Sequence, residues 1–514
     1  MSILLILSKT ISLTLFLALV AVLGSASGVS AAEREATPVV WIIPQPKRLR
    51  LPAGEPAFRL GHRLSWSVTG PPGETRVRDA VRAWLRGELG LRPAPAALHP
   101  SAGKWTVIRL GTTQPGARPI KSGALEPDWY RSPEGYRIRV DRRGVEIAAS
   151  TPAGAFYGLQ SLAQVVQQRE MGWECAALRV EDWPTMAFRG AHFFPSASGV
   201  PFHHKLITRV MARYKLNHAV IQCEAARWRS HPEIAAPNSI SKAELRKLVA
   251  LCRANFIEPV PLVNCPGHGQ WMFRNGKNLG LAEDSQTPYA YCVSNPASDR
   301  FIKAILTEAL DVFHPRYFHL GHDEVTLRGR FPNPNCKRCR GRTTTDLVLE
   351  HARRLSAWLA ERKVRTILWG DMLFAKGETA DGSAHAPNVT EAQTRRSGLP
   401  RDTIVADWHY GQGARYPSLD LLRKEGLSTL AVTWDKPLNI YHFCRAARRA
   451  GAWGLLQSTW CGYFPDETVL KSSRSQFSAF ILAGEYAWSA RSEAPAVLPY
   501  DADAEFTRAY YRRP

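Results

Sequence analysis

Tyr317-Phe-His-Leu-Gly-His-Asp-Glu324 is the stretch of sequence from which the fold can be worked out. Tyr317 to Leu320 predict a buried β-strand, and the strand runs directly into two adjacent carboxylates, Asp323 and Glu324. Barrel enzymes place their chemistry on residues at the ends of such strands. Two neighbouring carboxylates can also divide the work, with one protonated and the other ionised. Because a short Asp-Glu pair also occurs in solvated loops, the surrounding pattern decides between the two interpretations.

Short apolar strands alternate with amphipathic helices on both sides of this stretch. We expect strands near Phe188–Phe194, Ala219–Cys223, Pro259–Val263, Tyr317–Leu320, Thr366–Trp369, Ile404–Ala406, Thr429–Val432 and Trp453–Gln457. Helical segments separate them, such as Ser241–Asn255 and Asn295–Phe313, and Ser241 with Glu244 forms a capping box for the first. Eight such units in roughly 300 residues predict an α/β fold, a (β/α)8 TIM barrel.

The residues before the barrel predict a small α+β domain. Gly135–Val140 and Gly144–Ala148 alternate like the strands of a half-buried hairpin. Thr151 opens a helical segment that we extend through Gln168. Pro184 then interrupts regular structure. We therefore place this domain at 37–182, the barrel at 184–490 and a C-terminal extension at 491–514.

The first residues have the pattern of a signal peptide. Lys9 supplies a positive charge, Ile11–Gly24 an apolar core, and Val29-Ser-Ala-Ala32 a small-residue cleavage site. The core is too short to span a bilayer comfortably, and an uncleaved membrane anchor is the alternative. We expect removal of residues 1–31 and export of the protein, either secreted or periplasmic, with no stable membrane span.

The chain is basic, with a formal net charge of +22 at pH 7, and Lys9 is the only charged residue among the first 31. The arginines are scattered, as in Arg445, Arg448 and Arg449, so solvated helix faces account for most of them. Weak attraction to an anionic polysaccharide is a secondary possibility. Nucleic acid is not an expected partner, because the chain is predicted to be exported and has no recognisable nucleic-acid-binding motif.

Nine cysteines, an odd number, all follow residue 170. Cys336 and Cys339 are the only close pair, and zinc would need two further ligands at suitable spacing, for which no second pair exists. We therefore expect no metal and no cofactor. A local disulfide between these two is the preferred interpretation in an oxidising compartment. Cys223, Cys252 and Cys265 are expected to be free and buried.

The ends of the predicted barrel strands carry carboxylates, a histidine, an arginine and several indoles. The residues at these positions are Arg189, Glu224, His268, Asp323, Glu324, Trp369, Asp371, Trp408, Trp434, Asp435 and Trp460. Acids can act on a glycosidic bond, and flat apolar rings can face the C–H surface of a sugar. The combination indicates a carbohydrate-active enzyme, although each tryptophan is also compatible with core packing.

The chain resembles the family-20 glycoside hydrolases, the β-N-acetylhexosaminidases, over nearly all of the sequence after the predicted signal peptide. Two motifs look like that family's small N-terminal domain, namely Ile43-Pro-Gln-Pro-Lys47 and Gly154-Ala-Phe-Tyr-Gly-Leu-Gln160. The barrel motifs follow in the family's order: Phe188-Arg-Gly190, Tyr214-Lys-Leu-Asn217, Pro266-Gly-His268, Phe318-His-Leu-Gly-His-Asp-Glu324 and Leu368-Trp-Gly-Asp371. The resemblance implies removal of β-linked N-acetylglucosamine or N-acetylgalactosamine from a glycan or oligosaccharide.

The resemblance also implies a retaining reaction in which the acetamido oxygen of the substrate attacks the anomeric carbon. Glu324 would be the general acid and then the base that activates water, with a raised pKa. Asp323 would hold the acetamido N–H and stabilise the cyclic intermediate.

Other strand-end residues receive supporting roles from the resemblance. Arg189 would bind ring hydroxyls, and the tryptophans at 369, 408 and 460 are candidates for the walls of the pocket. Apart from the resemblance, His268 ends the third strand beside Glu224 on the second, which makes it a candidate proton relay towards Glu324, with loop packing of His268 as the alternative.

The sequence departs from the family pattern at four places. His322 stands where the family has glycine, which puts a titratable ring next to the acid, and Glu224 stands where it has aspartate. Thr433-Trp434-Asp435 lacks the tyrosine that positions the acetamido oxygen, and Tyr410 is the only replacement we identify. Trp460-Cys-Gly462 lacks a following glutamate. The carboxylate pair is intact while the recognition residues differ, so an unusual hexosaminide is expected.

Two other classes of function stay open. The first is a sugar-binding descendant that has lost turnover. The second is a glycosidase that acts on a sugar without an acetamido group, which would need a carboxylate nucleophile about 5 Å from Glu324. Asp371 and Asp435 are the candidates for that nucleophile.

Overall fold

The computed structural model describes residues 40–61, 64–92, 97–100, 106–111, 128–413 and 415–512, with the backbone alone at 97–100. The predicted signal peptide lies outside these residues. Within them, no helix combines the length and the apolar character needed to cross a bilayer.

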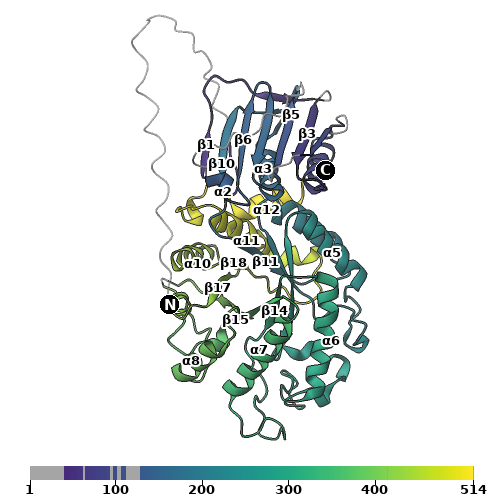
Figure 1. Ribbon diagram of the computed structural model, residues 1–514, viewed down its shortest axis with the longest axis vertical. Helices are drawn as coiled ribbons and strands as arrows, with labels where there is room; N and C mark the ends of the chain where they lie inside the picture. The colour runs from purple at the N-terminus through teal and green to yellow at the C-terminus, as the bar shows by residue number, and fades with distance from the viewer. Residues whose placement is uncertain are drawn as a thin grey trace, which may run out of the picture. The chain divides into compact units, whose positions relative to one another are not determined.

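The small domain is built on a seven-stranded sheet in the order β1-β10-β6-β7-β5-β3-β4 (Figure 1). Its strands are β1 Arg48–Arg50, β3 Ser65–Gly70, β4 Ala97–Pro100, β5 Thr106–Gly111, β6 Tyr136–Asp141, β7 Gly144–Ala149 and β10 Leu178–Asp182. The predicted hairpin is β6 and β7, which pair antiparallel. A second sheet has the order β2-β9-β8, formed by Phe58–Leu60, Gly172–Cys175 and Gln167–Arg169.

Helix α3, Pro152–Val165, packs on the larger sheet (Figure 1). The Thr151 side chain caps it by accepting a hydrogen bond from the Gly154 N–H at 3.3 Å. The helix ends at Val165, three residues before the end predicted at Gln168, because Gln167 to Arg169 form a strand that pairs with β9 instead. The described part of this domain also contains two shorter helices, α1 Arg76–Ala83 and α2 Asp128–Arg131, and a π-helix, η1 Trp84–Glu88.

Eight parallel strands form a closed barrel, which confirms the predicted fold (Figure 1). They are β11 Phe188–Phe193, β12 His218–Gln222, β13 Glu258–Cys265, β14 Tyr317–Gly321, β15 Arg365–Trp369, β16 Ile404–Trp408, β17 Ser428–Thr433 and β18 Gly454–Gln457. Each overlaps one of the predicted strands. The barrel closes through pairing of β11 with β18.

The outer helices of the barrel are α4 Val200–Lys205, α5 Lys242–Ala254, α6 Pro296–Phe313, α7 Thr344–Ala360, α8 Val389–Gly398, α9 Pro417–Lys424, α10 Pro437–Ala450, α11 Leu470–Trp488 and α12 Ala502–Tyr510. A π-helix, η2 Leu206–Met211, continues α4. Short 3-10 helices are η3 Pro232–Ile234, η4 Gly269–Trp271, η5 Arg274–Gly276, η6 Leu279–Leu281, η7 Asp371–Leu373, η8 Glu467–Val469 and η9 Pro495–Val497. The predicted capping box of Ser241 and Glu244 is present at the start of α5.

Alternation along the strands decides which side chains fill the barrel. Phe188, Val220, Val260, Ile367 and Leu456 pack together with other alternate residues in one buried cluster inside it. The intervening residues face the surrounding helices. The last inward-facing position of each strand therefore lies where the connecting loops begin.

Candidate active site

Asp323, Glu324 and His268 form the centre of the candidate site. The loop after β14 carries both carboxylates, and the loop after β13 carries the histidine. His268 Nε2 lies 3.2 Å from Asp323 Oδ2 and 3.3 Å from Glu324 Oε2. Their side chains are 15% to 31% exposed, so the group is largely desolvated but still reachable.

The protonation of this group follows from its geometry. Burial lowers the pKa of His268, but the two carboxylates outweigh burial and raise it to about 10. The hydrogen bond from His268 holds the pKa of Glu324 below its ordinary value. The expectation of a raised pKa for Glu324 is therefore wrong, because this geometry favours the proton on His268.

The backbone beneath the carboxylates adopts conformations that L-residues rarely take. Gly321, His322 and Glu324 have φ values of 72°, 75° and 47°. A Cβ on Gly321 would lie 2.4 Å from Asn264 Oδ1, and one on Gly267 would lie 2.9 Å from the Asp323 carbonyl oxygen. Glycine at both positions lets the loops after β13 and β14 touch, and the strained turn projects the carboxylates from the barrel.

Asp371 is fully engaged in positioning. Its Oδ2 accepts a hydrogen bond from the Glu324 N–H at 2.8 Å, and its Oδ1 accepts one from Trp408 Nε1 at 3.0 Å. Burial and the Asp323 charge raise the pKa of Asp371 to about 8, although these two donors favour the ionised form. Its oxygens bind protein groups, so it orients Glu324 and Trp408.

Glu224 lies at the end of β12 and is completely buried. Its Oε1 accepts hydrogen bonds from Gln222 Nε2 at 2.6 Å and from the Tyr463 hydroxyl at 2.7 Å. Burial raises the pKa of Glu224 to about 7 despite these two donors. The charge of His268 also favours the ionised form of Glu224, but the hydrogen bonds of the Glu224 carboxylate go to Gln222 and Tyr463, so the relay between Glu224 and His268 stays a prediction.

Four indoles and one phenol line the same end of the barrel. Trp369 lies 6.1 Å from Trp460, ring centre to ring centre, and the Trp460 Nε1 donates to the Tyr410 hydroxyl at 3.0 Å. Tyr410 stacks on Trp408 at 5.0 Å and lies 5.6 Å from Trp434. The rings thus form one connected aromatic cluster, in which Trp369 is buried inside the barrel and the other four are partly exposed. The partly exposed rings are suited to the apolar face of a sugar.

Several buried polar atoms around the site make no hydrogen bond to any described residue. They are Glu224 Oε2, His319 Nε2, Asp323 Oδ1, Trp369 Nε1 and Trp434 Nε1. Buried polar groups in folded proteins are almost always paired, because an unpaired one costs about 1–3 kcal/mol. Three donors and two acceptors at the strand ends are therefore available to a polar ligand.

The structure corrects the expectation for Arg189. Arg189 points out of the barrel, because it alternates with the inward-facing Phe188, and its guanidinium pairs with Glu134 at 2.8 Å. It therefore does not reach the strand ends. Asp435 is half-buried and receives a long hydrogen bond of 3.5 Å from the Ser475 hydroxyl on α11. We therefore do not retain Arg189 as a sugar ligand, whereas sugar binding by Asp435 stays a prediction.

The expectation for His322 is also corrected. Its ring is buried and bonds His351 on α7 at 2.9 Å, and His351 in turn bonds the Tyr291 hydroxyl at 2.7 Å. Burial lowers the pKa of His322 to about 3. The ring is therefore neutral at physiological pH and anchors the turn to α7.

The predicted disulfide is not formed, and both Cys336 and Cys339 have free thiols. A third thiol, Cys292, lies between them, 3.7 Å from Cys336 Sγ and 3.5 Å from Cys339 Sγ. The predictions of free buried thiols at Cys223, Cys252 and Cys265 are confirmed.

Several residues that complete the site were missed from the sequence. His192 donates to Gln222 Oε1 at 3.0 Å and packs 4.8 Å from the Trp460 ring. His319 packs 4.2 Å from Trp369, and Tyr289 donates to the Glu324 carbonyl oxygen at 3.2 Å. Alternation along β11 and β14 places His192 and His319 inside the barrel, and this signal could have identified them.

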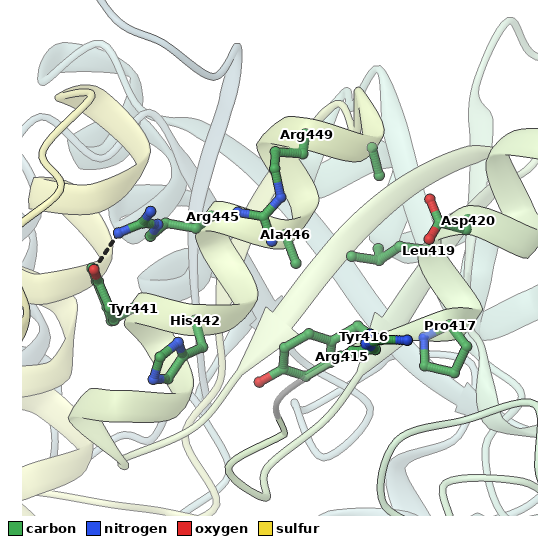
Figure 2. A pocket seen from close by; sticks show the side chains of 11 residues that line it. Arg415, Tyr416, Pro417, Leu419, Asp420, Tyr441, His442, Arg445, Ala446 and Arg449 are labelled. Carbon is green, nitrogen blue, oxygen red and sulfur yellow. Dashed lines mark hydrogen bonds between the residues drawn. The ribbon is translucent and has the colours of Figure 1, made fainter.

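A cavity of about 550 Å³ lies away from the strand ends, between α9 and α10 on the outer face (Figure 2). Arg415, Arg445 and Arg449 line it together with Asp420, and Arg445 donates a hydrogen bond to the Tyr441 hydroxyl. None of the candidate site residues lines this cavity, so we assign the chemistry to the strand ends.

Two family models match the chain. The model described as "Glycosyl hydrolase family 20, domain 2" matches residues 40–183, and the model described as "Glycosyl hydrolase family 20, catalytic domain" matches residues 209–428. Together they span the small domain and five of the barrel strands, β12 to β16.

Individual relatives agree with this match. A lacto-N-biosidase of Bifidobacterium bifidum is 23% identical over 325 residues, which are 60% of this chain and 27% of that protein. A beta-hexosaminidase of Akkermansia muciniphila is 23% identical over 330 residues, 58% of this chain and 62% of that protein. The chain thus spans less than two thirds of the length of these relatives.

Solved structures share the fold. The GH20 β-N-acetylhexosaminidase from Streptomyces coelicolor superposes with a TM-score of 0.67 at 18% identity, covering 93% of this chain and 97% of that one. A β-N-acetylhexosaminidase from Bacteroides fragilis gives a TM-score of 0.64 at 18% identity, covering 88% and 92%.

Proposed function

This chain belongs to glycosyl hydrolase family 20, and we propose that it is a glycosidase that releases β-linked N-acetylhexosamine from a glycan by substrate-assisted hydrolysis with retention. The observation that carries the proposal is the contact of one imidazole, His268, with both Asp323 and Glu324 at the open end of the barrel. The similar proteins named hexosaminidases support the substrate class.

In the first step, the acetamido carbonyl oxygen forms a bond to the anomeric carbon while the bond from that carbon to the leaving oxygen breaks. The leaving oxygen takes a proton from Glu324. That proton comes from the hydrogen bond that Glu324 Oε2 shares with His268 Nε2, since moving it across this contact converts imidazolium and carboxylate into imidazole and carboxylic acid.

Asp323 stabilises the charge that develops on the acetamido group. Its Oδ2 pairs with His268, and its buried Oδ1 has no partner among the described residues. This oxygen is therefore available to accept the acetamido N–H. In a largely desolvated site, an ionised acceptor there stabilises the positive intermediate more than it would in water.

Tyr410 is the residue that we assign to the acetamido carbonyl oxygen. Its hydroxyl oxygen accepts a hydrogen bond from Trp460 Nε1 and also interacts with the Ser458 side chain, and the hydroxyl carries one proton that it can donate. Burial raises the pKa of Tyr410, which keeps the hydroxyl protonated across the physiological range. Tyr410 thus substitutes for the tyrosine that is missing beside Trp434.

In the second step, Glu324 takes a proton from water, and the water oxygen bonds to the anomeric carbon as the intermediate ring opens. The product keeps the β configuration, because the anomeric carbon is inverted twice. His268 can share the second proton as it shared the first.

The test uses pairs of chromogenic β-glycosides that differ only in having a 2-acetamido or a 2-hydroxyl group. Hydrolysis of the acetamido substrate alone, with the β anomer formed first by NMR, is the expected result. A Tyr410→Phe variant should be slowed on this substrate, and Glu324→Gln purified in the same way controls for contaminating host enzymes.

Other results would select one of the alternative functions. Binding of N-acetylhexosamine without product would indicate a sugar-binding protein. Equal rates on both substrates would indicate a glycosidase with a carboxylate nucleophile, a role that the two existing hydrogen bonds of Asp371 disfavour.

We also propose that the protein is exported with cleavage near Ala31, on the basis of the apolar core and the small residues that follow it. Intact-mass measurement of protein from an exporting host should show loss of the leader. Retention of Met1 would contradict export by cleavage.

A further inference from the structure

Four side chains away from the carboxylate pair converge with the arrangement of a metal site. They are Glu283, Cys292, Cys336 and Cys339, and one ligand atom of each lies within 4.8 Å of every other. We propose that these residues bind a structural zinc ion.

The spacing of the sulfur atoms fits zinc. Zinc bonds thiolate at about 2.3 Å, so two sulfurs on a tetrahedral ion lie about 3.8 Å apart. Cys292 Sγ lies 3.7 Å from Cys336 Sγ and 3.5 Å from Cys339 Sγ. A disulfide bond, by comparison, holds its sulfurs at about 2.05 Å. One disulfide could also engage only two of the three thiols.

Glu283 supplies the fourth ligand and an independent observation. Its side chain is nearly completely buried, and its Oε1 accepts the Asn333 N–H at 2.9 Å. Its Oε2 is buried with no partner among the described residues. A buried carboxylate oxygen without a partner is costly unless a cation compensates it, and the adjacent thiols are the natural co-ligands.

The local backbone is already arranged for coordination. Cys336 and Cys339 have the C-x2-C spacing of zinc sites, and the Cys339 N–H donates to the Cys336 carbonyl oxygen at 3.3 Å. Glu283 and Cys292 are brought together by a short antiparallel pairing of Ala282 with Tyr291. The ligands therefore need little rearrangement to bind the ion.

The ion would join two loops of the candidate active site. Glu283 and Cys292 lie between β13 and α6, whereas Cys336 and Cys339 lie between β14 and α7. Tyr289, between the first two ligands, donates to the Glu324 carbonyl oxygen. We therefore assign the ion a structural role, with all four positions taken by protein ligands, that of holding the loop of His268 against the loop of Glu324.

The experiment measures metal and thiols on the full chain from an exporting host, alkylated at harvest. One zinc per chain by mass spectrometry, and no disulfide among these three cysteines, is the expected result. A disulfide joining any two of them would overturn the proposal.

A second measurement uses chain stripped with a chelator under reducing conditions and then titrated with Zn²⁺ or Co²⁺. We expect one Co²⁺ per chain with a thiolate-to-cobalt charge-transfer band, and a higher Tm with Zn²⁺. Failure of the folded, reduced chain to bind either ion would overturn the proposal.

Variants assign the ligands. Cys339→Ala should abolish stoichiometric binding, and Glu283→Gln should weaken it at least tenfold while keeping the charge-transfer band. Cys252→Ala is the matched control, because it removes a buried thiol from α5 and should leave the stoichiometry unchanged. Equal loss in the control and in Cys339→Ala would overturn the assignment. Since these readouts do not use turnover, they are independent of the proposed hydrolase activity.

Discussion

Asp371 Oδ2 accepts a hydrogen bond from the backbone N–H of Glu324 at 2.8 Å, and Oδ1 of the same carboxylate accepts one from the indole Nε1 of Trp408 at 3.0 Å. One buried carboxylate thus fixes both the candidate acid and a wall of the pocket. The Glu324 backbone has a φ of 47°, a conformation that needs such support.

Asp371→Asn should test this positioning role. An asparagine has one acceptor oxygen and cannot serve both donors, so either Glu324 or Trp408 shifts. We expect kcat to fall by about 10²-fold, the range for a misplaced catalytic group, with a smaller change in KM. Unchanged kcat with a raised KM would instead indicate direct substrate binding by Asp371.

The two adjacent carboxylates should separate in a leaving-group series. Glu324→Gln should lower the glycosylation rate by roughly 10²–10⁴ on substrates with poor leaving groups, the range for a lost general acid. The loss should shrink with good leaving groups, which need no proton. Asp323→Asn should slow both kinds alike, because it acts on the intermediate. Single-turnover rates measure this, and an equal fractional loss for Glu324→Gln across the series would exclude it as the acid.

His268 should control the alkaline limb of the pH–rate profile. The pair of His268 and Glu324 keeps its proton up to about pH 10, the pKa of His268. Without the imidazolium, the pKa of Glu324 should return towards that of an ordinary carboxyl, about 4.3. We expect the alkaline limb of kcat/KM in His268→Ala to move several units towards acid, with a large loss at pH 7. Normal turnover with an unchanged profile would leave His268 only a packing role.

Glu224 should make stability depend on pH. Burial raises its folded-state pKa to about 7, above the ordinary glutamate value of 4.5. The unfolded chain therefore releases this proton first, and the folded protein loses stability as pH rises from 4.5 to 7, by roughly 3 kcal/mol in total. Glu224→Gln removes this dependence. As pH rises from 4.5 to 7, the free energy of unfolding of the variant should therefore increase relative to that of the parent protein. Denaturant unfolding at several pH values measures it. A constant difference would show that the pKa of Glu224 is not raised.

The barrel could be predicted because apolar strands and capped helices are local patterns. All eight strands were located from the sequence, and the capping box of Ser241 is where the pattern placed it. The predicted C-terminal end of α3 was wrong, because the strand pairing of Gln167 with Glu174 is a tertiary contact that the local sequence pattern does not reveal.

The candidate site was only partly predictable, for the same reason. Asp323 and Glu324 follow directly from the end of a strand. The direction of Arg189 depends on strand alternation and on Glu134, which belongs to the small domain. The grouping of Cys292 with Cys336 and Cys339 depends on two loops that meet only in the fold.

The buried pairing of Arg189 with Glu134 bears on how this protein can be divided. Glu134 Oε1 also accepts a hydrogen bond from Asn217 Nδ2 at 2.9 Å, and Asn217 Oδ1 accepts one from the Arg189 N–H at 2.8 Å. A barrel expressed alone would keep a guanidinium at its amino end with no counter-ion, and breaking such a buried pair costs about 3–5 kcal/mol. The small domain and the barrel therefore form one cooperative unit and are not interchangeable modules.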